Sequence, residues 1–173
     1  NRAHLRFGLG FDEMPYFCTS HAFCKRIMGI SQVMDGKDVM EFLKEYEFKL
    51  SKNHGVGPKA VKTVVQDPYF DIIERAKTNC HSLKEERLSL DQEQRKGVSS
   101  HMLEPIAEAW EKFRLSRVPP VYSFADMINK FLVDGAPPEL DVLIVDEAQD
   151  LAELNWRLVE KLGQNAGKTY IAG

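Results

Sequence analysis

The sequence predicts an α/β fold built on a parallel sheet, with a mostly helical segment inserted into it. One observation is an apolar run at residues 142–145, followed by acidic residues, a helical pattern over 151–162 and a strand-like run over 168–172. Strand, helix and strand in this order are typical of a parallel βαβ unit. The other observation is the helical spacing of apolar residues through residues 35–115, which favours a helical insertion.

The composition is that of an ordinary globular protein. The 173 residues are 43% hydrophobic and 28% charged, with a formal net charge of -3, so any DNA contact must come from a local patch. Three cysteines give no disulfide framework and indicate a reducing compartment, the cytoplasm or the nucleoid. No apolar run approaches the roughly 20 residues that a membrane span needs, so no membrane partner is expected.

The first part, residues 1–34, is expected to belong to the α/β domain. Residues 15–19 are aromatic and β-prone, which predicts a short strand. Thr19 or Ser20 is placed to cap a helix over residues 21–28, which Gly29 then ends.

Residues 35–118 are expected to form the inserted helical subdomain. Apolar residues at helical spacing predict a helix within 39–50, and residues 53–58 read as a loop. The Asp-Pro pair at residues 67–68 predicts the start of a helix that continues through 69–77.

The second half of the insertion begins with the charge-dense residues 84–96, which are expected to be solvated. Ser99 or Ser100 starts another helix, which the prolines after Val118 terminate. Four apolar residues define the buried side of that helix: Leu103, Ile106, Trp110 and Phe113.

Residues 119–173 return to α/β order. Ser123 and Asp126 have the spacing of a capping box, which predicts a helix through Leu132. A turn is expected at residues 135–138, before the apolar strand already described.

Acidic residues stand at the end of that strand, which is expected to be buried. Asp146 and Glu147 follow Val145 directly, and ligands of open α/β sheets bind at the carboxyl ends of strands. One carboxylate there can hold hydrated Mg²⁺, and the second can orient and deprotonate an attacking water, as phosphoryl transfer requires. The structural alternative is an acidic helix N-terminus that complements the helix dipole.

Residues 143–150, Leu-Ile-Val-Asp-Glu-Ala-Gln-Asp, resemble motif II of the UvrD/Rep-like superfamily 1 DNA helicases. The resemblance implies a RecA-like P-loop NTPase domain that binds ATP and Mg²⁺. By the same resemblance, Asp146 binds Mg²⁺ through water, and Glu147 lies at the metal and is the catalytic base. Gln149 senses the γ-phosphate, Asp150 supports the motif, and all four residues belong to the ATP site.

Two shorter segments resemble DNA-contacting segments of the same family. One runs Thr19, Ser20, His21, Ala22, Phe23 and then Arg26, although the family often has Phe where this chain has Ser20. The other is residues 122–127, which contain Phe124. Hydroxyl groups can donate to phosphates, rings can stack on bases and a cation adds positive charge, so these residue types suit contact with single-stranded DNA. For the first segment the alternative is an ordinary helix start, with His21 as a polar cap and Phe23 in the core. For the second segment the alternative is an amphipathic helix with a good N-cap.

Two other patterns do not carry a site. Residues 163–169 resemble a phosphate loop, but only three residues separate the glycines where the pattern needs four, and the order runs from helix into strand. Cys18, His21 and Cys24 lack the spacing of a zinc site, so free thiols are expected.

The sequence thus predicts part of the first motor domain of an ATP-dependent DNA helicase that moves on single-stranded DNA and unwinds duplex junctions, as in DNA repair. No Gly-x-x-x-x-Gly-Lys-Ser/Thr pattern occurs in the chain, so we expect no appreciable ATP hydrolysis by these residues alone. Two alternatives stay open: a motor subunit of a helicase–nuclease recombination complex, and a degenerate helicase-like domain that only binds DNA or protein. A monomer is compatible with the sequence.

Overall fold

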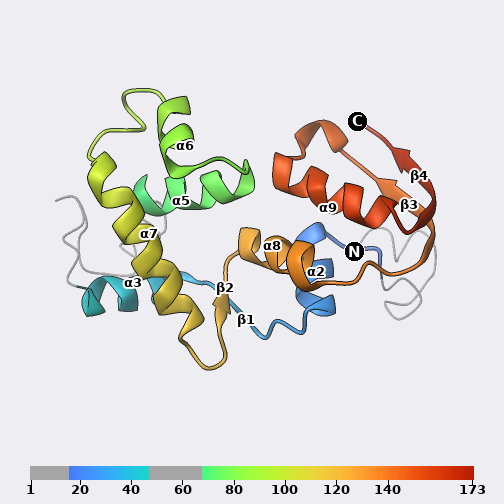
Figure 1. The fold of residues 1–173 in the computed structure, drawn as a ribbon, viewed down its shortest axis with the longest axis horizontal. Helices are drawn as coiled ribbons and strands as arrows, with labels where there is room; N and C mark the ends of the chain where they lie inside the picture. The colour runs from blue at the N-terminus through green and yellow to red at the C-terminus, as the bar shows by residue number, and fades with distance from the viewer. Residues whose placement is uncertain (1–15, 47–67) are drawn as a thin grey trace.

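The computed structural model of the chain describes residues 16–46 and 68–173, and shows a mixed fold of helices and short parallel strands (Figure 1). The helices are α2 Ser20–Ile27, α3 Gly36–Glu45, α5 Pro68–Thr78, α6 Leu83–Ser89, α7 Ser100–Leu115, α8 Phe124–Asp134, the short 3-10 helix η2 Ala148–Asp150, and α9 Glu153–Gly163. The strands are β1 Gln32–Val33, β2 Val121–Tyr122, β3 Leu140–Val145 and β4 Ala166–Ile171. No helix in these ranges has the length and apolar character to cross a membrane. Predictions for residues 1–15, 53–58 and 67 lie outside the described residues.

Two small parallel sheets organise the described chain. β1 pairs with β2, so the strands on either side of residues 35–118 lie next to each other. β3 pairs with β4 from Leu140 opposite Ala166 to Val145 opposite Ile171, with α9 between them in sequence. The predicted βαβ unit is therefore confirmed. The strand expected at residues 15–19 is wrong for the described residues 16–19, where the backbone turns into the cap of α2.

The β3 strand is less buried than its apolar sequence predicts. Val142 is 45% exposed and Ile144 is 70% exposed. Alternate side chains of a strand point to opposite faces, and α9 contacts the sheet on the face of Leu143 and Val145. The other face is open among the described residues, so the prediction of a strand buried on both faces is wrong.

One hydrophobic core joins α2, α8 and α9 (Figure 1). It is formed by one apolar face from each helix: Phe23 and Cys24; Ala125, Met127, Ile128 and Phe131; and Leu154, Leu158 and Leu162. The helix ends follow the local sequence. Thr19 caps α2, Gly29 with a φ of +62° ends it, and Ser123 and Asp126 form the predicted capping box of α8.

A second, aromatic core lies among α3, α5 and α7 at the other end of the molecule (Figure 1). The centroid of the Phe42 ring lies 5.1 Å from that of Trp110 and 5.5 Å from that of Phe113. The predicted inner face of α7 is confirmed, because all four of its apolar residues are buried.

Asp126 joins the two ends of the molecule. Its carboxylate accepts a hydrogen bond from Lys77 Nζ of α5 at 2.8 Å and another from the guanidinium of Arg114 of α7. Arg114 is fully buried and also donates to the Val121 carbonyl at 3.3 Å. Asp126, the N3 residue of the capping box of α8, therefore also links α8 to the helical segment within residues 35–118.

Candidate functional site

The acidic loop, residues 146–150, lies at the carboxyl ends of β3 and β4. The Ala172 N–H donates to the Val145 carbonyl, and the Ala148 N–H donates to the Ala172 carbonyl, both at 2.9 Å. Ala148 is buried, whereas Asp146 and Glu147 are exposed. The backbone is thus fixed by the end of β4 while both carboxylates face solvent.

Glu147 has a left-handed backbone, with φ 53° and ψ 41°. This conformation costs a non-glycine residue about 1–3 kcal/mol and is found most often at functional sites. The side chain is held in place, because Gln149 Nε2 donates to Glu147 Oε2 at 2.6 Å. Glu147 and Gln149, which the sequence assigns to one site, therefore lie in direct contact.

Gly173 lies closely against the acidic loop. A Cβ at this position would overlap the Gln149 side-chain oxygen and lie 3.0 Å from the Ala148 nitrogen. A larger residue at this position would require the end of the Gln149 side chain to move.

Asp146 suits a hydrated Mg²⁺ ion. Its Oδ1 accepts the Glu147 N–H at 3.1 Å, and the exposed carboxylate has a second oxygen. Mg²⁺ in nucleotide sites keeps several waters and takes only one or two protein carboxylates. Across residues 16–46 and 68–173, no group of three or more His, Cys, Asp and Glu side chains is arranged to hold a metal.

Two of the predicted DNA-contact residues, His21 and Phe124, meet at the N-termini of α2 and α8. The His21 and Phe124 rings have centroids 4.9 Å apart at an interplanar angle of 58°. Phe124 is 59% exposed. Thr19 lies beside this pair, where its hydroxyl caps α2 by accepting the Ala22 N–H at 3.3 Å.

Phe23 and Ser20 both make contacts inside the fold. Phe23 is buried against Phe131, with ring centroids 5.2 Å apart, so its face is closed to a nucleotide base. The Ser20 hydroxyl donates to Asn155 Oδ1 of α9 at 2.9 Å. We therefore take Thr19, His21, Arg26 and Phe124 as the candidate contact residues, of which Arg26 lies apart in the last turn of α2.

Tyr16 adds an exposed ring that the sequence did not single out. The Arg26 guanidinium lies 5.6 Å from the centroid of the Tyr16 ring. In the sequence, the position of this aromatic residue three places before the helix cap Thr19 was the feature that could have indicated it. A ring with a cation over its face is a feature of surfaces that stack bases.

Burial sets the charge states of two side chains in α2. Desolvation lowers the pKa of His21, so the imidazole is neutral at pH 7 and offers a ring and a hydrogen bond, not a charge. Burial, together with the nearby Cys18, raises the pKa of Cys24 to about 12. The Cys24 thiol is thus a packing group, while Cys18 is exposed and also free.

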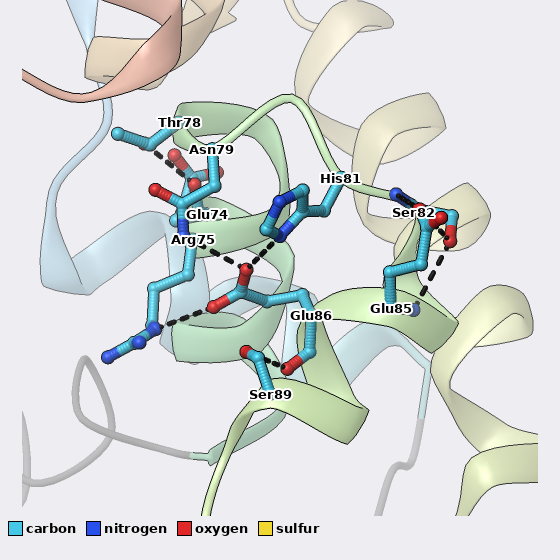
Figure 2. Close-up of polar contacts among 9 residues, drawn as sticks. All are labelled: Glu74, Arg75, Thr78, Asn79, His81, Ser82, Glu85, Glu86 and Ser89. Carbon is cyan, nitrogen blue, oxygen red and sulfur yellow. Dashed lines mark hydrogen bonds and ion pairs between the residues drawn. The ribbon is translucent and has the colours of Figure 1, made fainter.

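A polar cluster around the buried Glu86, formed by α5, α6 and the turn between them, is the main feature that sequence reasoning missed. Figure 2 shows the Glu86 carboxylate accepting hydrogen bonds from Arg75 and Asn79, both at 2.9 Å, and lying 3.0 Å from His81 Nδ1. The Glu86 side chain is 0% exposed, so the prediction that residues 84–96 are solvated is wrong at this position.

The signal for this burial was present in the spacing. Glu86 stands three residues after Leu83 and four before Leu90, on a face that packs inward. Desolvation acts to raise the pKa of Glu86, but hydrogen bonds from Asn79, Arg75 and His81 outweigh it and hold the pKa below its ordinary value. The cluster ties α5 to α6 and is remote in sequence from the acidic loop.

Comparison with known proteins gave no match among family models, curated proteins or solved structures.

Proposed function

We propose that the chain is part of the first motor domain of a superfamily 1 DNA helicase of the UvrD/Rep-like type, with a RecA-like core. The observation that carries the proposal is the acidic loop. Asp146 and Glu147 follow the end of a parallel strand, beside the end of its neighbour, with Gln149 bonded to Glu147. This position and residue order fit the metal and base side of an ATP hydrolysis site.

The arrangement of the two cores supports the proposed insertion. The core of α2, α8 and α9 draws its buried residues from outside residues 35–118, and the aromatic core draws its own from inside them. β1 and β2, at the two ends of that segment, are paired neighbours. A helical subdomain that leaves and re-enters one α/β domain would have this organisation.

The proposed reaction is hydrolysis of the γ-phosphate of ATP. A water attacks the γ-phosphorus, the bond to the bridging oxygen breaks, and ADP leaves with the bonding electrons. Glu147 takes the proton of the water, and Gln149 orients that carboxylate. Mg²⁺, when bound, neutralises phosphate charge, and Asp146 would hold it through water with Glu147 beside it.

The proposed nucleic-acid contacts are Thr19, His21 and Phe124 at the helix N-termini and Arg26 in the last turn of α2. The neutral His21 ring and the exposed Phe124 ring offer faces for bases, and Arg26 offers charge to the backbone. Single-stranded DNA is the substrate class that these groups fit, because unpaired bases expose their faces.

The base assignment is tested by Glu147→Gln in the intact protein that contains this chain. The amide keeps the size of the side chain but cannot accept a proton from water, so kcat should fall by about 10²–10⁴-fold. Nucleotide binding, measured with a fluorescent ATP analogue, should be unchanged. Glu153→Gln is the matched control, because Glu153 is an exposed carboxylate on α9 that pairs only with the exposed Arg157 among the described residues.

Wild-type hydrolysis by Glu147→Gln would contradict the assignment of the base. Absence of DNA-stimulated ATP hydrolysis in the intact wild-type protein would contradict the motor function itself and favour a binding domain.

A further inference from the structure

The Ser20 hydroxyl connects the proposed DNA surface to the helix that follows the acidic loop. Ser20 is the first residue of α2, between Thr19 and His21. Its side chain is half-buried and donates to Asn155 Oδ1 at 2.9 Å. In the described part of the chain, this is the one side-chain hydrogen bond between α2 and α9.

Asn155 is held close to the acidic loop by a short series of backbone hydrogen bonds. Its N–H donates to the Ala152 carbonyl at 2.9 Å, and the Leu151 N–H donates to the Ala148 carbonyl at 3.2 Å. Ala148 is bonded in turn to the end of β4. Two successive turns therefore connect the acidic loop to Asn155 in the first turn of α9.

The far end of α9 is fixed to a different helix. Lys161 Nζ donates to the carbonyls of Phe131 and Leu132 at 3.0 and 2.8 Å, at the C-terminal end of α8. Leu154, Leu158 and Leu162 pack between these attachments, in the core shared with α2 and α8. A small movement at the N-terminus of α2 would therefore act on α9 at the end nearest the acidic loop.

We propose that the Ser20–Asn155 hydrogen bond couples occupancy of the DNA-contact surface to the geometry of the acidic loop. Asn155 is a positioning residue for the stimulation of ATP hydrolysis by DNA, and it acts through its hydrogen bond with Ser20. The inference rests on the proposed function. A hydrogen bond between α2 and α9 couples the two sites when DNA binding and ATP hydrolysis favour the same arrangement of these helices.

The test is the rate of ATP hydrolysis by the intact protein as a function of the concentration of oligodeoxythymidine. Asn155→Ala should lower the DNA-stimulated kcat by about five-fold while the rate without DNA stays unchanged. Ser20→Ala should lower the stimulated rate as well, and the double variant should be no worse than the more affected single variant. Ser20→Thr keeps the hydroxyl and should retain stimulation.

Arg157→Ala is the matched control on the same helix, because it breaks an exposed ion pair with Glu153 and leaves the Ser20–Asn155 bond intact. Full stimulation of Asn155→Ala, or single effects that add in the double variant, would overturn the coupling. A wild-type protein that hydrolyses ATP but ignores DNA, or hydrolyses none, would instead contradict the proposed motor. The two failures are therefore distinguishable.

Discussion

At the scale of single residues, two phenylalanines from the candidate DNA segments have opposite environments. Phe23 is 6% exposed and packs against Phe131, whereas Phe124 is 59% exposed beside His21. Phe124 is the first residue of α8 and Phe23 lies in the first turn of α2, so both lie near the start of a helix of the same core. Phe23 points into the core and packs there, whereas Phe124 points to solvent and is free to contact a ligand.

We expect Phe23→Ala and Phe124→Ala to affect different properties. Phe23→Ala should lower the free energy of unfolding by about 3–5 kcal/mol, because it leaves a cavity in the core. Phe124→Ala should change that energy by less than about 0.5 kcal/mol. It should weaken binding of single-stranded DNA by about 1–3 kcal/mol if a base stacks on the ring.

Urea unfolding and fluorescence anisotropy with a labelled oligonucleotide measure the two properties in the intact protein. Wild-type DNA affinity in Phe124→Ala would remove this ring from the contact surface.

At the scale of elements, local signals predicted most of the described helices, but not α6, where a solvated charged stretch was expected. The capping box of Ser123 and Asp126 opens α8 as expected, since both partners lie within one turn of the same helix. The inner face of α7 was also predicted, because a helix with one apolar stripe can bury it in only one way.

Features that depend on distant residues could not be predicted in the same way. The exposure of Ile144 depends on which strands and helices cover β3, and the sequence of β3 carries no information on that. The contact of Gln149 with Glu147 needs the turn after β3, whose left-handed residue is not a glycine. The spacing of Leu83, Glu86 and Leu90 indicates a face that packs inward, but not the hydrogen-bond partners of Glu86, which come from α5 and from the turn that follows it.

The Glu86 cluster should make the stability of the fold depend on pH in the acidic range. The pKa of Glu86 is lower in the folded chain than its ordinary value. Its contribution to stability is therefore fully present above the ordinary glutamate pKa and is lost as pH falls through the lowered value. Glu86→Gln should cost about 1.5–3 kcal/mol at pH 7, because hydrogen bonds to a charged group are lost.

The difference in unfolding free energy between wild type and Glu86→Gln should shrink as pH falls below the ordinary glutamate pKa. Urea unfolding of both proteins at neutral and acidic pH measures it. Glu104→Gln, which changes an exposed glutamate of α7, should change stability little at either pH. A Glu86→Gln penalty that is equal at both pH values would show that the carboxylate charge is not what stabilises the cluster.

At the scale of the whole molecule, two cores are joined through a small number of polar contacts. α5 contacts both α8 and α9, and Asp126 accepts from Lys77 at 2.8 Å and from Arg114. Burial acts to raise the pKa of Asp126, but the charges of Lys77 and Arg114 and hydrogen bonds from Lys77 and Ser123 outweigh it and lower the pKa. The carboxylate is thus an anion between two cations from the helical segment.

Loss of that charge should loosen the helical segment from α8 more than it disturbs either core. Asp126→Asn keeps the size of the side chain but leaves the buried Arg114 without its counter-ion, which should cost about 3–5 kcal/mol. Hydrogen exchange should then accelerate most in α5 and α7, whose attachment depends on this carboxylate, and less in α9.

The matched control is Asp134→Asn, which changes an exposed aspartate at the other end of α8 that pairs with Lys130. This substitution should change stability by less than about 0.5 kcal/mol. Equal acceleration in all helices would mean that the two cores unfold as one unit, and unchanged exchange would mean that hydrophobic contacts alone hold the helical segment in place.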